Sequence, residues 1–184
     1  MVFYIDGKKE ESSREISCLL KKCIQVHTRK WSELVFLCIG SDRMTGDCLG
    51  PYIGQKLSSY EWNGIFVYGT LSDPVHALNL EKICTHIRQK HPKALVIAID
   101  ACLGEKKHLG YVTIGNGALH PGAGVRKKLS PVGDIYITGI VNIAGVLEQL
   151  TLQTTRLYTV VSLADTIAQG ILYTLPLGSF TEKL

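Results

Sequence analysis

The sequence predicts a three-layer α/β/α sandwich built on a mostly parallel sheet of five strands. Two nearly continuous apolar runs, at 33–40 and 94–100, are typical of strands that are buried on both faces. Segments with apolar residues at helical spacing alternate with such runs along the chain. Strands that alternate with helices form right-handed crossovers, which place helices on both sides of a parallel sheet.

Helices and strands are expected to alternate from the N-terminus through the first half of the chain. Residues 10–28 predict an amphipathic helix, because Ile16, Leu20 and Ile24 recur at helical spacing. The elements that we expect after it are a strand at 33–40, a helix at 47–60 that begins at Asp47, a strand at 64–69, a helix at 72–92, strands at 94–100, 110–117 and 134–141, and helices at 142–153 and 156–171.

Residues 72–92 carry the clearest helical pattern. Ser72 or Asp73 can cap this helix, and Pro74 suits its first turn. An apolar stripe would face the sheet, formed by Val75, Leu78, Ile83 and Ile87.

The 184 residues are enough for a single domain, 1–184, in which residues 1–30 form an N-terminal helical extension. The formal net charge is only +4, and the lysines and arginines are scattered along the chain. A nucleic-acid-binding protein usually gathers them on one element, so we expect no nucleic-acid partner. The oligomeric state stays open, with a homo-oligomer as one possibility.

Targeting signals are not expected in this sequence. The first ten residues carry charges, so no apolar secretory run is expected, and no stretch approaches the roughly 20 apolar residues that span a bilayer. The six cysteines form no CxxC pair, and several lie in predicted core elements. We therefore expect reduced, buried thiols in a cytoplasmic protein that does not bind a membrane.

The fold class also predicts where a functional site lies. In open α/β sheets, ligands bind beyond the carboxyl ends of the parallel strands. This rule selects the loop after Ile39, Asp100 with the residues that follow it, and the glycine-rich segment after Ile114. Glycines and ionisable side chains gather in the same three segments, so we expect them to meet in one crevice.

The first of these segments, GSDRMTGDCLGP at 40–51, is not a phosphate-binding loop. A Walker sequence needs a lysine after its second glycine, and Asp47 stands at that place. The GxGxxG pattern of dinucleotide-binding proteins is also absent from the chain. Asp47 is consistent with a helix cap or with a functional carboxylate, and Asp42 with a turn residue or a substrate-binding residue.

Asp100 and His120 complete the candidate site. Asp100 closes an apolar strand, where a charge is costly unless it is paired or used. His120 lies in a loop rich in glycine. Because glycine allows close backbone approach, Gly117, Gly122 and Gly124 are candidates to offer backbone amides to a substrate carbonyl.

Two chemistries stay open for these side chains. Two neighbouring carboxylates, here Asp47 and Asp100, can share a proton and activate water without a cofactor. The same carboxylates with His120 could instead hold a divalent metal ion that activates water. A nucleophilic Cys48 or Cys102 is a weaker hypothesis, because nothing nearby in the sequence lowers a thiol pKa. The GxSxG pattern of serine hydrolases is absent.

Several segments in a fixed order resemble known families. VIAIDACLG (96–104), LHPGAGVRKKL (119–129) and ITGIVN (137–142) resemble the core of the spore germination protease, an endopeptidase that degrades small acid-soluble spore proteins. FLCIGSDRMTGDCLGP, VYGTLSDPVHALNLE and HPGAGVRKKLSPVGDIYITGIVN are closer still to the YyaC family of sporulation proteins. The resemblance covers residues 33–171.

The resemblance implies a fold shared with the hydrogenase maturation proteases, and it places Asp47 and Asp100 at the essential aspartates of the germination protease. The maturation proteases bind nickel through an acidic residue, an aspartate and a histidine, which would correspond to Asp47, Asp100 and His120. We therefore expect a hydrolase in the cytoplasm of the developing spore or its mother cell, acting on a peptide or small protein. The alternatives are a non-catalytic peptide- or metal-binding module in spore development and a metal-dependent peptidase.

Overall fold

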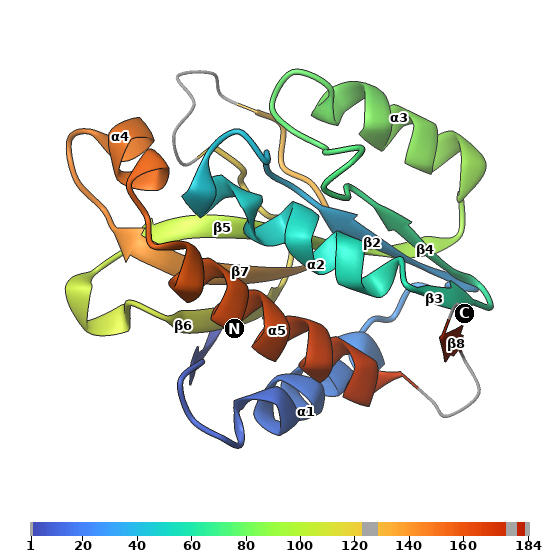
Figure 1. The fold of residues 1–184 in the computed structure, drawn as a ribbon. Helices are drawn as coiled ribbons and strands as arrows, with labels where there is room; N and C mark the ends of the chain where they lie inside the picture. The colour runs from blue at the N-terminus through green and yellow to red at the C-terminus, as the bar shows by residue number, and fades with distance from the viewer. Residues whose placement is uncertain (1, 123–128, 176–179, 183–184) are drawn as a thin grey trace.

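A computed structural model of the chain describes residues 2–122, 129–175 and 180–182. Its centre is a six-stranded sheet with the strand order β1-β6-β7-β5-β2-β4 (Figure 1). In this sheet β6 runs antiparallel to its two neighbours, and the remaining strands all run in one direction. The strands of the sheet are β1 (Val2–Asp6), β2 (Glu33–Cys38), β4 (Ile65–Tyr68), β5 (Ala94–Gly104), β6 (Tyr111–Asn116) and β7 (Ile135–Ile143).

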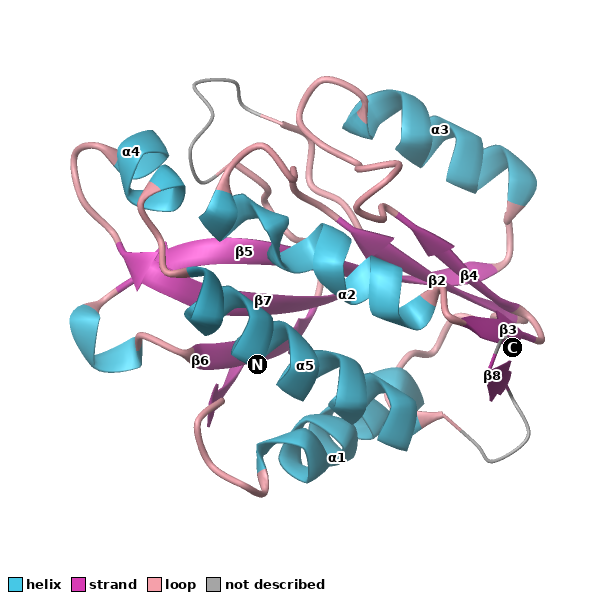
Figure 2. Ribbon diagram, in the orientation of Figure 1, coloured by secondary structure: helices cyan, strands magenta, loops and turns pink. Residues whose placement is uncertain are grey.

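Helices cover both faces of the sheet, as Figure 2 shows. One face carries α1 (Ser12–Gln25), α2 (Leu49–Leu57) and α5 (Leu157–Thr174), and the other carries α3 (Leu80–Lys90). The remaining elements are the short helix α4 (Glu148–Gln153), the 3-10 turns η1 (Thr45–Cys48) and η2 (Lys106–His108), and a separate ribbon of β3 (Tyr60–Trp62) with β8 (Phe180–Glu182).

Two apolar cores result from this layering, and β2 contributes to both. Its side chains alternate between the faces: Phe36 packs in the core under α1, α2 and α5, whereas Val35 and Leu37 pack in the core under α3. All three are at most 1% exposed. A strand covered on both faces needs apolar residues at every position, which explains the continuous apolar run.

The predicted fold class is confirmed, but the predicted count of five strands is too low. Residues 2–6 form β1, which pairs antiparallel with β6 at the edge of the sheet. The N-terminal segment is therefore more than a helical extension, since it supplies a strand as well as α1. Among the described residues, no helix is long and apolar enough to cross a lipid bilayer.

Two predicted helices begin later than expected. The first residues of 142–153 continue β7, and α4 begins only at Glu148. The helix predicted at 72–92 begins at Leu80, and residues 72–79 form a loop instead. In this loop Val75 pairs with Ile39, so the loop is held against the end of β2.

Candidate active site

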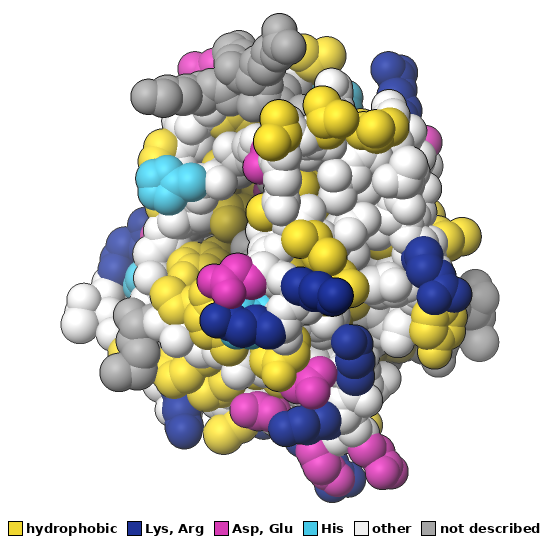
Figure 3. Space-filling view, turned by 90° about the vertical axis from the view of Figure 1, so that its left-hand side faces the viewer, with side chains coloured by type: hydrophobic (Ala, Val, Ile, Leu, Met, Phe, Trp, Pro, Cys, Tyr) yellow, Lys and Arg dark blue, Asp and Glu magenta, His cyan; other side chains and the backbone are white. Residues whose placement is uncertain are grey.

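A hollow of about 190 Å³ lies at the edge of the sheet where the parallel strands end. Figure 3 looks onto this side of the molecule, which is the left-hand side of Figure 1. The hollow is lined by side chains from the loop after β2, from β5 and from the 72–79 loop, and among them are Asp47 and Asp100. The prediction that these two carboxylates meet beyond the strand ends therefore agrees with where the structure places them.

The turn after β2 places Asp47. Gly40 has a φ of 141°, and a Cβ atom there would lie 2.0 Å from the backbone oxygen of Asp47. Only glycine therefore allows the chain to fold back so tightly. The backbone N–H of Ser41 donates to the Asp47 backbone oxygen at 3.1 Å, which closes the loop.

Asp47 lies within η1, just before α2, but it caps neither helix with its side chain. The interpretation of Asp47 as a helix cap is therefore wrong. Burial raises the pKa of Asp47 from 3.8 to about 6, and a hydrogen bond from the Ser41 backbone partly opposes this rise. At neutral pH the Asp47 side chain is thus mostly ionised, yet it is much easier to protonate than an exposed aspartate.

Asp100 is placed by β5, which extends past the end of β2. The last residue pair of these two strands is Cys38 with Ile99, so Asp100 is the first β5 residue beyond it. Only 7% of Asp100 is exposed, and its Oδ1 accepts the backbone N–H of Ala101 at 2.8 Å. No Lys, Arg or His side chain in the described part of the chain forms an ion pair with it.

The environment of Asp100 therefore favours its neutral form. Burial raises the pKa of Asp100 well above 3.8, and the negative charge of Asp47 raises it further. The two carboxyl groups thus differ, because the neutral form is favoured more strongly at the more deeply buried Asp100 than at Asp47. Environments that separate two carboxyl pKa values in this way are typical of acid–base catalysis.

The nearby thiols are poor nucleophiles. Burial raises the pKa of Cys102 to about 11, although its hydrogen bond with Thr138 partly opposes this rise. The Cys102 thiol donates to Thr138 Oγ1 at 3.3 Å. Burial also raises the pKa of Cys48, with a contribution from the Asp47 charge, and its thiol donates to the Thr45 carbonyl at 3.0 Å. Neither cysteine has the electropositive setting that a reactive thiolate requires.

His76 is a lining residue that the sequence analysis missed. The loop that carries it is held by a 2.8 Å hydrogen bond from the Gly40 N–H to the Val75 carbonyl. Within the loop, Nδ1 of His76 accepts the Leu78 N–H at 3.3 Å. This bond fixes Nδ1 as the acceptor, so the proton of a neutral His76 ring lies on Nε2, which is available to a ligand. Because β4 is also a parallel strand, the rule of strand ends could have pointed to the loop that follows it.

The other predicted site residues lie in different places. Gly122 lines the hollow, whereas His120 is exposed and is not among the lining residues. Asp42 is exposed as well, on the turn after β2. Gly117 follows the end of the antiparallel strand β6 and lines a hollow at the opposite edge of the sheet. Gly124 lies outside the described residues.

The predicted metal site of Asp47, Asp100 and His120 is not assembled in the described part of the chain. No three His, Cys, Asp or Glu side chains there are placed so that they could hold a metal ion together. Asp47 and Asp100 both line the hollow and could supply two carboxylate ligands. His120 is not among the lining residues. The described residues that line this hollow therefore do not fit a resident metal.

Comparison with known proteins gives three findings. Residues 4–170 match the family described as "Protein of unknown function (DUF1256)". The chain is 44% identical over 168 residues to the uncharacterized protein YyaC of Bacillus subtilis (strain 168), and the match covers 91% of this chain and 81% of YyaC. The crystal structure of the NiFe hydrogenase maturation protease HycI from Thermococcus kodakarensis KOD1 is similar with a TM-score of 0.49 and 16% identity, over 84% of this chain and 99% of that one.

Proposed function

The chain belongs to the DUF1256 family, together with YyaC, and we propose that it hydrolyses peptide bonds with Asp47 and Asp100 as its reacting acid pair. The observation that supports this most is the buried carboxyl group of Asp100, which lies in the same hollow as Asp47 and has no ion-pair partner among the described residues. Burying a carboxyl group without a basic partner costs stability, so such a group usually has a functional use.

The two pKa values define separate roles for the two carboxyl groups. The ionised Asp47 accepts a proton from a water molecule, whose oxygen attacks the peptide carbonyl carbon. The neutral Asp100 donates its proton to the carbonyl oxygen, which gives a neutral tetrahedral intermediate. When this intermediate collapses, Asp47 passes its proton to the leaving nitrogen, and Asp100 recovers a proton from the hydroxyl group. Both side chains thereby return to their starting states.

His76 and the backbone near Gly122 would complete the site. His76 can donate from Nε2 to the substrate carbonyl, since its Nδ1 is held by Leu78. Gly122 has a φ of 145°, and apart from its chain neighbours no other described residue has an atom within 4 Å of the position where a Cβ would be. Its backbone is therefore open to close approach by a substrate chain.

The rim of the hollow suits a peptide with apolar side chains. Leu78 is 89% exposed and lines the hollow itself, which is also lined by Gln149 of α4. Three further hydrophobic side chains are exposed in and just before α4, namely Val146, Leu147 and Leu150. Figure 3 shows hydrophobic groups gathered on this side of the molecule. Exposed apolar patches of this kind mark binding surfaces.

The motifs shared with the germination protease support a substrate found in sporulating cells. We accordingly propose a peptide or small protein in the cytoplasm of the developing spore or its mother cell as the substrate. Small spore proteins are the first substrates to test, with a proteome-derived peptide mixture as the second.

The test compares the purified wild type with Asp47→Asn and Asp100→Asn, and mass spectrometry identifies cleaved peptides. Acid–base groups contribute about 10² to 10⁴ in rate, so each variant should lose at least about 99% of the turnover. Asp42→Asn is the matched control, because it removes an exposed carboxyl group from the same segment. Equal turnover by the wild type and both site variants would refute the proposal.

Two further measurements separate the alternatives. Tight peptide binding without turnover by the wild type would instead identify a binding module. Loss of activity with a chelator, together with stoichiometric bound metal and loss of both in His120→Ala, would identify a metal-dependent peptidase. The acid-pair mechanism predicts activity that persists in the chelator.

A further inference from the structure

The candidate active site is the end of a longer groove on the α3 side of the sheet. A second hollow of about 180 Å³ shares Ala77, Leu78 and Leu129 with it. A third hollow, of about 500 Å³, shares Cys84, Arg88, Pro131 and Val132 with the second one. Because each hollow shares lining residues with the next, the three lie in a row beside α3, and we call this row the groove.

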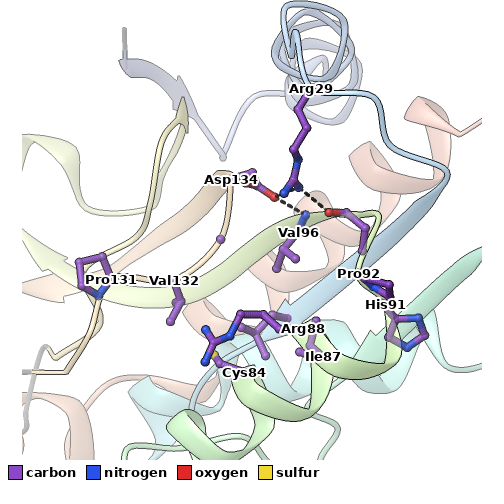
Figure 4. A pocket seen from close by; sticks show the side chains of 13 residues that line it. Arg29, Cys84, Ile87, Arg88, His91, Pro92, Val96, Pro131, Val132 and Asp134 are labelled. Carbon is purple, nitrogen blue, oxygen red and sulfur yellow. Dashed lines mark hydrogen bonds and ion pairs between the residues drawn. The ribbon is translucent and has the colours of Figure 1, made fainter.

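Figure 4 shows the third hollow, the large hollow of the groove, at its end away from the acid pair. Its walls are α3, which carries Ile87, and the segment 131–134, whose Val132 pairs with Leu119. The floor is the sheet face near Leu37 and Val96. The groove thus has an apolar floor and two walls, as in sites that hold an extended ligand.

The two arginines that line the large hollow, Arg29 and Arg88, differ in their partners. Arg29 is held by Asp134, with an Nη2 to Oδ2 distance of 3.0 Å, and by the carbonyl of Ala94 at 2.6 Å. Arg88 has a hydrogen bond only to Thr85 Oγ1, at 3.1 Å, and forms no ion pair with an acid in the described residues. Glu81, the acidic side chain of the middle hollow, is not paired with Arg88 either.

Among the described residues that line the large hollow, Arg88 is therefore a cation that a ligand can use. Its side chain extends from α3 toward the opposite wall (Figure 4). It lines both the middle and the large hollow, so a carboxylate in either would lie beside it. An arginine fork matches a carboxylate with two parallel hydrogen bonds.

We propose that this groove binds an extended peptide segment, with the bond to be cut at Asp47 and Asp100 and a carboxylate of the same peptide paired with Arg88. This inference rests on the proposed peptide hydrolysis, and it adds the path and one recognition feature of the substrate. The large hollow is lined by Ala94 and Val96 of β5, four to six residues before Asp100. At about 3.3 Å per residue this span is about 13–20 Å, so a carboxylate held by Arg88 in the large hollow lies about four to six extended residues from the cut.

The test uses a proteome-derived peptide library, prepared once with free C-terminal carboxylates and once with amidated C-termini. The wild type and Arg88→Gln are compared for the peptides that they cleave. In parallel, the inactive Asp100→Asn protein and the double variant with Arg88→Gln are immobilised, and the retained peptides are identified. Arg14→Gln, an exposed arginine change on α1 outside the groove, is the matched control.

The expected result is an excess of Asp, Glu or a free chain end at one distance of about four to six residues from the cut, and its loss in Arg88→Gln. For peptides with the carboxylate, kcat/KM should fall about tenfold, as for the loss of a charge-assisted hydrogen bond. Peptides without it should be cleaved equally by both proteins. A preference that disappears on amidation identifies the chain end as the source, and one that persists identifies a side chain.

The remaining outcomes distinguish the groove proposal from the proposed hydrolysis. Cleavage without this preference, or a preference that survives in Arg88→Gln, would overturn the groove proposal and leave hydrolysis standing. Retention of acidic peptides by the Asp100→Asn protein in an Arg88-dependent way, with no cleavage by the wild type, would support the groove and overturn hydrolysis. Neither cleavage nor retention would overturn both.

Discussion

Replacing Asp47 with Asn should stabilise the folded protein at neutral pH while it removes the proposed catalytic base. Burial raises the pKa of Asp47 from 3.8 to about 6. The folded state therefore binds this proton more tightly than the unfolded chain does. Ionising Asp47 in the folded state costs free energy of unfolding, and an uncharged asparagine of similar shape does not carry this cost.

The size of the effect follows from the pKa change. One pKa unit corresponds to about 1.4 kcal/mol, so a change from 3.8 to about 6 amounts to about 3 kcal/mol. Asparagine also weakens the hydrogen bond from the Ser41 backbone, which subtracts about 1 kcal/mol. We therefore expect Asp47→Asn to raise the free energy of unfolding by about 1–3 kcal/mol at pH 7.

The sign of the pH dependence is fixed by the raised pKa. In the wild type the contribution of Asp47 is most favourable below about pH 4, where both states are protonated, and it declines between about pH 4 and 6. Above about pH 6 it stays constant, because both states are ionised. The stability difference between Asp47→Asn and wild type should therefore open between these two pH values and remain at pH 8.

Urea unfolding at pH 4, 6 and 8 measures this difference, with tryptophan fluorescence as the signal from Trp31 and Trp62. The control is Asp42→Asn, where an exposed carboxyl group is replaced and no burial cost is relieved. The reasoning is refuted if Asp47→Asn is less stable than wild type at pH 8. It is equally refuted if the difference between the two proteins is the same at pH 4 and pH 8.

Three other predictions concern activity, packing and thiol chemistry. Hydrolysis should follow a bell-shaped pH profile, in which the rate rises near pH 6 as Asp47 ionises and falls at higher pH as Asp100 loses its proton. Steady-state kcat/KM measured between pH 4 and 10 checks this, and a rate that is flat across pH 5–7 would contradict it. Gly54→Ala should lower the free energy of unfolding, measured by urea titration, by about 3 kcal/mol, because the new Cβ would lie 1.9 Å from the Gly69 carbonyl oxygen. The control Gly145→Ala has open space around the new Cβ and should change this free energy by less than about 0.5 kcal/mol. A thiol reagent should modify the exposed Cys18 in the native protein but reach the buried Cys38 only after unfolding, since burial raises the pKa of Cys38; peptide mapping after labelling distinguishes the two, and early labelling of Cys38 would disprove this.

The positions of Asp47 and Asp100 could be predicted because they depend on features that are local in the sequence. The apolar run of β2 ends at a glycine, and the run of β5 ends at the aspartate itself. Parallel neighbours then bring the two segments to one edge, whatever the exact crossovers are.

The 72–79 loop could not be predicted, because its apolar residues have the spacing that is typical of a helix. Val75 and Leu78 fit the helical stripe, yet Val75 is buried beside Ile39 and Leu78 points into solvent at 89% exposure. Asn79 decides the outcome through its side chain. Its Oδ1 accepts the His76 N–H at 2.8 Å, and its Nδ2 donates to the Pro74 carbonyl at 3.0 Å. Asparagine side chains that bond nearby backbone groups compete with the helix in this way.

The 72–79 loop also explains why the pKa shifts of Asp47 and Asp100 could not be predicted from the sequence. A strand end is open to water unless other segments cover it, and an open Asp100 would ionise like any exposed aspartate. Here the 72–79 loop, the Gly122 backbone and Gln149 of α4 surround the two carboxyl groups. These segments come from three separate parts of the chain, and their joint effect is the burial that raises the pKa of Asp100 well above its ordinary value and that of Asp47 to about 6. The sequence therefore contains the two acids, but only the covering segments turn them into an acid and a base.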